Sequence, residues 1–577
     1  MKNLFKNKLF LLGLIVILAC FLRFFKLGSV PLELNRDEAS LGYTAYSILK
    51  TGREEHGQFW PIQIESFGDW KLPLYVYSLI PFIAVFGLEA WVVRLPSALV
   101  GIGIIIVSHF LVLRLFDKTQ KKNLLAILIP LLLAVSPWQI HFSHVAYEAH
   151  LSMFLFILGL LGFLIVKEKF LKLKIRDIRL FSLSMLSWAV TLLGYHAYQA
   201  FIPLFFISMM FFYRDFLKRF FTDKNGKYFF KDLFIALLPF MIIGSVLIAS
   251  GVSGANKTKF SGLSIFSPQS YSLEVGKERQ MLPSPNHPFF VFVINKYTSI
   301  VNQIETNFFN LISPDFLFIR GGNNGAHNIT GYGNLYSFLF FGLVVGIVSI
   351  FISSSESLSI LGIWLITASV APMITFAANH TVRFSPGFIP AEILSVYGWL
   401  VIFNILRKKI SAKFFKIILS IFFIVVFYLV YKFLVTYYFI FPRRDLERWS
   451  WQMKSVVFQV DVLKDNYDKV IVQDEQSSPY IYFLFHLKVD PETLSERIEY
   501  YPVDNEGFKH VKRFDNIYFE KIDWEIRNYS DENRLFVVSN QEIPDYNRFN
   551  ENFSLIEVLE NDNVKKEVEF WSYQSLQ

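Results

Sequence analysis

Residues 93–137, VRLPSALVGIGIIIVSHFLVLRLFDKTQKKNLLAILIPLLLAVSP, contain two apolar runs, 93–113 and 123–137, separated by the basic loop 114–122. A helix needs about 20 apolar residues to cross the hydrocarbon core of a bilayer. Lys and Arg concentrate in the short loops on the cytoplasmic side. The stretch therefore predicts two spanning helices joined by a cytoplasmic turn.

The same alternation continues along the whole chain of 577 residues. Hydrophobic residues make up 53% of it and charged residues 18%, below the roughly 25% that is usual in globular domains. The sequence predicts an all-α polytopic membrane protein with about eleven spanning helices. These lie at 9–25, 93–113, 123–137, 149–166, 180–195, 198–213, 232–250, 335–352, 358–377, 385–404 and 414–440.

The distribution of Lys and Arg sets the predicted orientation. The inner pieces 1–8, 114–122, 167–179, 214–231, 353–357 and 405–416 carry 24 Lys and Arg in 65 residues. The opposite loops carry 13 in 175 residues. The net charge of +8 therefore reflects membrane topology and does not indicate a nucleic-acid partner. We expect a multi-pass protein of the plasma membrane.

Two apolar segments could be assigned in more than one way, as membrane spans or as other kinds of segment. The N-terminal run resembles a signal peptide, but the many later helices favour a retained first span. Residues 72–92 are long enough to span, but spanning would place the later basic loops outside. Pro73 and Pro81 favour an interfacial or re-entrant segment. Cys20 is the single cysteine, so no disulfide forms within the chain.

The chain divides into a predicted membrane domain, 1–441, with outer loops 26–92 and 251–334, and a soluble extracytoplasmic domain, 442–577. The tail is polar, and its short β-branched or aromatic runs predict strands. A small α/β domain follows from this pattern. The expected strands are Val470–Val472, Tyr480–Phe485, Phe536–Val538 and Leu555–Val558.

The first outer loop carries an acid pair, Asp37 and Glu38, just after the first span. Carboxylates beside a membrane are costly unless they are solvated or used. They also suit the first turn of a helix, whose dipole favours negative charge. Both interpretations stay open on local sequence alone.

Further polar residues lie on the same predicted side. Lys71 either snorkels to water or meets a lipid phosphate. Glu148 follows His141 and His144 and precedes His150, in a spacing that matches no standard metal motif. His380 and Arg383 either anchor the helix at the interface or bind a phosphate, Arg through its two-pronged donor set.

Together these residues suit group transfer from a lipid-linked phosphate. A carboxylate can remove the proton of an acceptor, and cations can stabilise a departing phosphate. Five stretches resemble the GT-C glycosyltransferases, related to dolichyl-phosphate-mannose protein mannosyltransferases and to the lipid A aminoarabinose transferase. They are RDEASLGYTAYSILKTGREEHGQFWP (36–61), SFGDWKLPLYVY (66–77), RLPSALVG (94–101), SPWQIHFSHVAYEAH (136–150) and NHTVRFS (379–385).

The resemblance covers most of residues 20–400 and implies an inverting hexosyltransferase that uses a polyprenyl-phosphate sugar. It implies that Asp37 is the catalytic carboxylate, that Glu148 is the second acidic point and that Lys71 contacts the donor phosphate. We also expect Glu38 at the catalytic centre. The chain lacks the inserted β-trefoil domain of the O-mannosyltransferases and ends in an α/β tail.

The expected reaction moves a hexose-type sugar to an extracytoplasmic acceptor hydroxyl on a protein, lipid or glycan. Arg383, with His380 and Arg94, would join Lys71 at the leaving phosphate. These cations replace a divalent metal, so no metal or other cofactor is expected to be obligatory. The alternatives are a lipid flippase or transporter without chemistry, and a polymerase or ligase of surface glycans.

Overall fold

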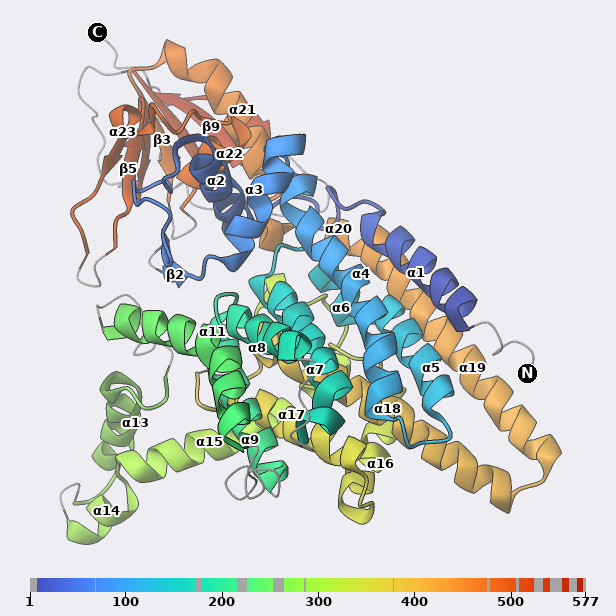
Figure 1. Ribbon diagram of the computed structural model, residues 1–577. Coiled ribbons are helices and arrows are strands. Elements are labelled where there is room, and N and C mark those ends of the chain that lie inside the picture. The colour runs from blue at the N-terminus through green and yellow to red at the C-terminus, as the bar shows by residue number, and fades with distance from the viewer. Residues whose placement is uncertain are drawn as a thin grey trace. The chain divides into compact units, whose positions relative to one another are not determined.

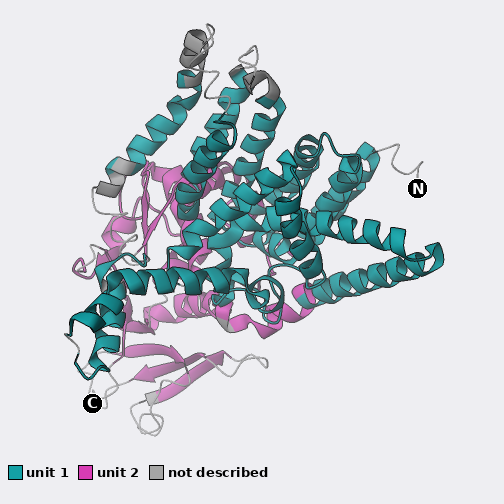
Figure 2. Ribbon diagram, turned by 90° about the horizontal axis from the view of Figure 1, so that it is seen from below, with its two compact units in different colours: residues 1–25, 97–436 teal, residues 26–96, 437–577 magenta. Residues whose placement is uncertain are grey.

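The protein is described by a computed structural model that covers most of the chain. The described residues are 8–67, 69–171, 178–214, 226–252, 264–284, 287–376, 378–474, 478–504, 508–522, 533–539, 553–559 and 568–573. The chain forms two compact units. Unit 1 contains residues 1–25 and 97–436, and unit 2 contains residues 26–96 and 437–577 (Figure 2).

Unit 1 is helical throughout its described part (Figure 1). Apolar residues dominate most of these helices, as the bilayer requires of helical surfaces that lie in lipid, whereas α13 is mainly polar. The helices are α1 (Lys8–Phe24), α4 (Ala90–Leu115, shared with unit 2), α5 (Lys122–Val135), α6 (Pro137–Ser143), α7 (Glu148–Leu171), α8 (Ile178–Thr191), α9 (His196–Phe212), α11 (Gly226–Val252), α13 (Pro268–Gln280), α14 (Pro288–Val293), α15 (Lys296–Ile312), η2 (Asp315–Ile319), η3 (Gly325–His327), α16 (Leu339–Ile352), α17 (Glu356–Met373), α18 (Thr381–Lys409) and α19 (Ala412–Val435).

Several of these helices are long and apolar enough to cross a membrane. In the described part of the chain, five helices qualify by length and composition, and a sixth span is possible if the bent pair α5 and α6 counts as one. Their axes differ by 58°. The predicted helical membrane architecture is therefore confirmed in outline, and the number of eleven spans stays a prediction.

The ambiguous segment 72–92 contains the short helix α3 (Leu74–Phe86), which has Pro81 inside it and ends at Gly87. At 1.5 Å per residue, its 13 residues extend about 20 Å, less than the roughly 30 Å hydrocarbon core. The next helix, α4, begins at Ala90 and is long enough to span. This geometry fits the interfacial or re-entrant prediction.

Unit 2 is built around a mixed seven-stranded sheet in the order β4-β5-β6-β3-β7-β9-β8. The central strand β3 pairs in parallel with both β6 and β7, and the other pairs are antiparallel. One buried cluster on the sheet consists of Ile471, Ile522, Phe536, Val538, Trp571 and Tyr573. The strands are β3 (Lys469–Gln473), β4 (Ile498–Tyr500), β5 (Val511–Phe514), β6 (Ile517–Glu520), β7 (Arg534–Ser539), β8 (Phe553–Leu559) and β9 (Val568–Tyr573).

The remaining elements of unit 2 come from both ends of the chain. The first outer loop supplies α2 (Arg36–Thr51), the hairpin of β1 (Ile64–Ser66) and β2 (Asp69–Lys71), α3 and the first turns of α4. The later segments are η4 (Thr436–Ile440), which straddles the boundary, α20 (Phe441–Arg444), η5 (Leu446–Trp449), α21 (Met453–Leu463), η6 (Lys464–Asn466), α22 (Tyr480–His486) and α23 (Leu494–Arg497).

Three of the four predicted strands are confirmed, as parts of β3, β7 and β8. The prediction for Tyr480–Phe485 is wrong, because these residues form the helix α22. All six side chains are buried, so the run shows no alternation of polar and apolar residues. A short run that is apolar throughout does not distinguish a buried helix from a buried strand.

The first outer loop packs against the tail inside unit 2, and α2 lies beside α22 (Figure 1). A Cβ atom at Gly42 would lie 2.7 Å from the ring of Phe485 and 2.7 Å from Val93, so glycine permits this close approach. The Tyr43 hydroxyl donates a hydrogen bond of 3.2 Å to the carbonyl of Val489. The domain boundary at residue 441 stays a prediction, while the compact unit that holds the tail also takes in residues 26–96.

Candidate active site

The acid pair lies in the first turn of α2, as its sequence favours. Asn35 caps the helix: its side chain accepts from the backbone N–H of Glu38 at 3.0 Å, and the Glu38 carboxylate accepts from the backbone N–H of Asn35 at 3.2 Å. This reciprocal pair satisfies two of the N–H groups that a helix start leaves open. Asp37 and Glu38 are consecutive, so their side chains leave the helix in different directions.

Glu38 points into the protein and meets Arg94 from the first turn of α4. The guanidinium binds both carboxylate oxygens, at 2.9 and 3.1 Å, and neither side chain is more than 1% exposed. Arg94 also donates to the carbonyls of Leu27, Pro31 and Glu33 at 3.3, 2.9 and 2.7 Å. These five bonds match the five N–H groups of an arginine, which favours a positioning role over the predicted phosphate contact.

Asp37 points the other way, toward Lys71 at the end of β2. The distance between Asp37 Oδ1 and Lys71 Nζ is 2.9 Å. The two partners differ in access: the Asp37 side chain is 60% exposed, whereas the Lys71 side chain is 8% exposed. The contact therefore presents a carboxylate to solvent above an ammonium that is anchored inside unit 2.

Phe67 completes this cluster, and the sequence analysis did not single it out. The Lys71 ammonium and the Arg36 guanidinium each lie 5.5 Å from the centre of its ring. Phe67 has a backbone φ of 52°, which is rare for a residue with a side chain. Its position at the β1–β2 turn was the available signal. We call Asp37, Glu38, Phe67, Lys71 and Arg94 the Asp37 cluster.

Unit 1 holds the other predicted residues. His380 caps α18, with its Nδ1 accepting from the backbone N–H of Arg383 at 3.3 Å. The Arg383 side chain donates to the Thr375 hydroxyl at 3.2 Å and to the Phe376 carbonyl at 2.7 Å. Since Nδ1 accepts, a neutral His380 carries its proton on Nε2, where it can donate a hydrogen bond.

A loop from the second outer segment joins this group through His327. Its ring lies 4.7 Å from that of His380 and 5.3 Å from that of Tyr147. The Tyr147 hydroxyl donates to the Ala326 carbonyl at 2.5 Å, and Glu148 follows directly as the first residue of α7. We call Tyr147, His327, His380 and Arg383 the His380 cluster. His327 has no spacing signal in the sequence and was missed.

Burial lowers the pKa of His380 well below its usual range, and the nearby His327 and Arg383 lower it further. His380 is therefore neutral at neutral pH. It can donate a hydrogen bond to a phosphate but does not add positive charge, so Arg383 is the cation of this cluster.

The three histidines near Glu148 bind the protein itself. His141 Nε2 lies 3.0 Å from the Ala326 carbonyl, and His144 Nδ1 lies 2.9 Å from the Ile140 carbonyl. His150 Nε2 is 3.3 Å from the side-chain nitrogen of Gln139. Within the ranges that the structure describes, no three His, Cys, Asp or Glu side chains are grouped as a metal site.

The structure thus brings together four of the predicted residues in unit 2 and, in unit 1, His380 with Arg383. Asp37, Glu38, Lys71 and Arg94 form one group in unit 2, joined by two ion pairs. Glu148, His380 and Arg383 belong to unit 1. A shared role of the two clusters at one substrate stays a prediction.

No protein-family model matches the chain, and no curated protein matches it. Solved structures of two GT-C glycosyltransferases are similar to it. One is the archaeal oligosaccharyltransferase AglB from Archaeoglobus fulgidus, in complex with an inhibitory peptide and a dolichol-phosphate. The identity is 14%, the TM-score is 0.48, and the match covers 83% of this chain and 63% of that chain.

The other similar structure is ArnT from Cupriavidus metallidurans bound to undecaprenyl phosphate, at 14% identity and a TM-score of 0.48. The match covers 97% of each chain. The apo state of ArnT matches at 12% identity and a TM-score of 0.41, again over 97% of each chain. The chain spans about 63% of the length of the oligosaccharyltransferase that it matches.

Proposed function

We propose that the protein is an integral membrane glycosyltransferase. It moves a hexose-type sugar from a polyprenyl-phosphate donor to a hydroxyl group of an extracytoplasmic acceptor, and it inverts the configuration at C1. The acceptor is a protein, a lipid or a glycan, and the site faces the outside of the plasma membrane. One observation carries the proposal: the exposed Asp37 carboxylate lies 2.9 Å from the buried Lys71 ammonium.

This arrangement places a base beside a fixed positive charge. Apart from Asp37 and the Phe67 ring, the Lys71 ammonium has no hydrogen-bond partner in the described part of the chain. An ammonium carries three N–H groups, and leaving them without acceptors in a buried site costs free energy. The phosphate of the sugar substrate, entering beside Asp37, would accept hydrogen bonds from these N–H groups and share the positive charge.

The proposed step uses this pair of groups. Asp37 accepts the proton of the acceptor hydroxyl, and the hydroxyl oxygen forms a bond to C1 of the sugar. The bond between C1 and the phosphate oxygen breaks, and its electron pair leaves with the polyprenyl phosphate. Attack from the face opposite the leaving group inverts C1. Lys71 stabilises the charge that grows on the phosphate.

The other predicted residues take supporting roles in this proposal. Glu38 and Arg94 hold the start of α2 and thereby position Asp37. Arg383 and the neutral His380 donate to the donor phosphate, and Glu148 is the second acidic group. Cations supply the charge that a divalent metal supplies in other transferases, so we expect transfer to continue in EDTA.

The test is transfer by the purified full-length protein from a polyprenyl-phosphate hexose labelled in the sugar. Product formation by the wild type and its loss in Asp37→Asn would support the proposal, and NMR of the product would report inversion at C1. Movement of the intact lipid across a vesicle membrane without cleavage would instead indicate a flippase. A product with repeated sugar units would indicate a glycan polymerase.

A further inference from the structure

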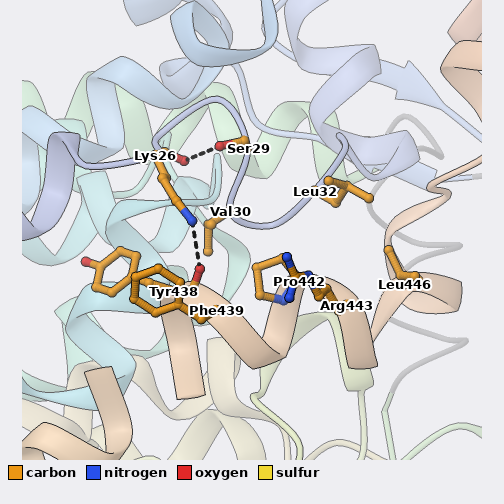
Figure 3. Close-up of a pocket in the computed structure, with 9 residues that line it drawn as sticks. All are labelled: Lys26, Ser29, Val30, Leu32, Tyr438, Phe439, Pro442, Arg443 and Leu446. Atoms are coloured by element: carbon orange, nitrogen blue, oxygen red, sulfur yellow. Dashed lines mark hydrogen bonds between the residues drawn. The ribbon is translucent and has the colours of Figure 1, made fainter. Parts of the chain in front are cut away.

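A second site in unit 2 is lined by none of the residues of the Asp37 cluster. It is a cavity of about 340 Å³, a volume in the range of small-molecule pockets. Its walls include Lys26, Val30, Leu32, Phe439, Arg443 and Leu446 (Figure 3). Lys26 follows the end of α1 by two residues, and Phe439 and Arg443 lie in the last turns of the candidate span Ala412–Arg444.

One wall of the cavity carries a lysine held in place by its backbone and its contacts. Lys26 has a φ of 58°, a left-handed conformation that turns the chain out of α1. Its ammonium donates to the Tyr438 carbonyl at 3.3 Å and lies 4.5 Å from the centre of the Phe439 ring (Figure 3). These contacts direct the charge toward the segment that forms the other wall.

That other wall carries an arginine whose neighbours are neutralised. Arg444 and Arg448 form ion pairs with the buried Asp445 at 3.1 and 3.6 Å. Arg443 is exposed and, among the described residues, has no hydrogen-bond or ion-pair partner. Asp445 therefore pairs with Arg444 and Arg448, and Arg443, which pairs with no described carboxylate, is left to complement an anion at the cavity.

Most of the remaining lining is apolar. Val30 and Leu446 are 1% and 3% exposed, whereas Phe439 is 53% exposed. Only 6% of the apolar stretch within the span Ala412–Arg444 is buried within the protein, so its surface is available to lipid chains. On the predicted topology this end is extracytoplasmic, where the positive-inside rule does not account for Lys26 and Arg443.

We propose that this cavity binds the phosphate headgroup of an anionic membrane phospholipid, with the acyl chains along the apolar surface of the span. Two cations with apolar walls match an amphiphile with a negative head. A water-soluble phosphate ester would match the cations but not the exposed Phe439. The proposal uses no residue assigned to sugar transfer, so it stands or falls separately from the glycosyltransferase proposal.

The test uses the full-length protein in neutral detergent and native mass spectrometry with added phosphatidylglycerol or phosphatidylcholine. The wild type should retain one more tightly bound phosphatidylglycerol than the Lys26→Gln/Arg443→Gln variant. Each lost charged hydrogen bond should weaken that binding about tenfold. The matched control, Lys50→Gln/Lys521→Gln, removes two exposed cations of the same unit and should bind like the wild type.

Two further variants keep the test decisive if the double glutamine variant unfolds. Arg443→Gln alone removes a side chain without an ion pair and should weaken the lipid, while Lys26→Arg/Arg443→Lys should retain it. Equal retention of phosphatidylglycerol by Arg443→Gln and wild type would overturn the proposal. So would equal binding of phosphatidylcholine, or displacement of the lipid by an equimolar amount of soluble glycerol phosphate.

Discussion

Asp37 and Glu38 are neighbours on one helix, yet their ion pairs differ in one physical respect, access to water. The Glu38–Arg94 pair is closed, with both side chains at most 1% exposed and the guanidinium fully hydrogen-bonded. The Asp37–Lys71 pair is open on one side, with a carboxylate side chain that is 60% exposed and a lysine side chain that is 8% exposed.

This difference in access distinguishes a pair that holds the backbone in place from a pair that can contact a substrate. A closed pair cannot exchange partners without exposing a buried charge, so it fixes the backbone around it. An open pair can exchange a carboxylate for a phosphate at little cost, because water and the incoming anion replace what is lost. Sequence alone assigned both acids to the catalytic centre, and the structure gives each a distinct environment.

The largest expected effect comes from the open acid. Asp37→Asn keeps the size of the side chain and removes its charge, so it removes the proposed base. Loss of a general base lowers rates by about 10²–10⁴, while folding and donor binding should be preserved. Sugar transfer and donor binding by the same purified sample measure both. Near-normal transfer would move the base elsewhere, with Glu148 the next acid to test.

Breaking the closed Glu38–Arg94 pair should lower the stability of the folded protein. Arg94→Met leaves the Glu38 carboxylate and three carbonyls without their donor. Removing one partner of a buried pair costs about 3–5 kcal/mol. Arg94→Lys should not restore it, because an ammonium cannot serve five acceptors. Thermal unfolding measures the loss. A variant that unfolds like the wild type but binds donor weakly would make Arg94 the phosphate ligand that the sequence predicted.

Glu55 adds a third environment to the comparison, burial without an ion pair. It accepts from the Tyr480 hydroxyl at 3.2 Å, and no ion pair with it occurs in the described residues. Burial raises the pKa of Glu55 from 4.5 to about 7. The folded state thus holds this proton more tightly than the unfolded chain, and stability falls as pH rises between about 4.5 and 7.

This rise in the pKa of Glu55 corresponds to a loss of about 3 kcal/mol of stability at high pH. Glu55→Gln should therefore raise the unfolding temperature at pH 8 and change it little at pH 4. The control Glu499→Gln alters an exposed acid whose pKa is lowered by Lys512 and Arg513. It should not reproduce this pH dependence. An equal gain for Glu55→Gln at both pH values would mean that folding does not raise the pKa of Glu55.

The smallest effect is expected for Lys71, the cation of the open pair. Lys71→Ala should weaken donor binding by about 1.5–3 kcal/mol, roughly 10- to 100-fold, as for other hydrogen bonds to charged groups. Lys71→Arg keeps the charge and should retain part of the affinity. Lys50→Ala removes an exposed lysine of the same unit as a control. Unchanged donor affinity in Lys71→Ala would leave Lys71 an interfacial residue without a substrate role.

Much of this architecture is accessible from sequence because it rests on local signals. The apolar runs mark α4, α7, α17, α18 and α19. The start of α2 is marked by residues typical of a helix N-terminus, namely Asn35, Asp37 and Glu38. The resemblance named Asp37 and Lys71 in separate stretches, and the structure places them in contact.

Other features depend on contacts that no local pattern encodes. Tyr480–Phe485 lacks periodicity because every side chain is buried, so its helix was predicted as a strand. The closed environment of Arg94 depends on carbonyls of residues 27–33, brought close by tertiary folding. His327 reaches Tyr147 and His380 from a distant loop.

The composition of unit 2 from two distant parts of the chain has a consequence for biosynthesis. A ribosome makes residues 26–96 first, and residues 97–436 must follow before the tail exists. Until then, Gly42 has no Phe485 to meet, and Tyr43 lacks its acceptor at Val489. The loop that carries Asp37 is thus completed last, although it is translated almost first. Unit 2 can therefore assemble only after the chain has been synthesised as far as its tail.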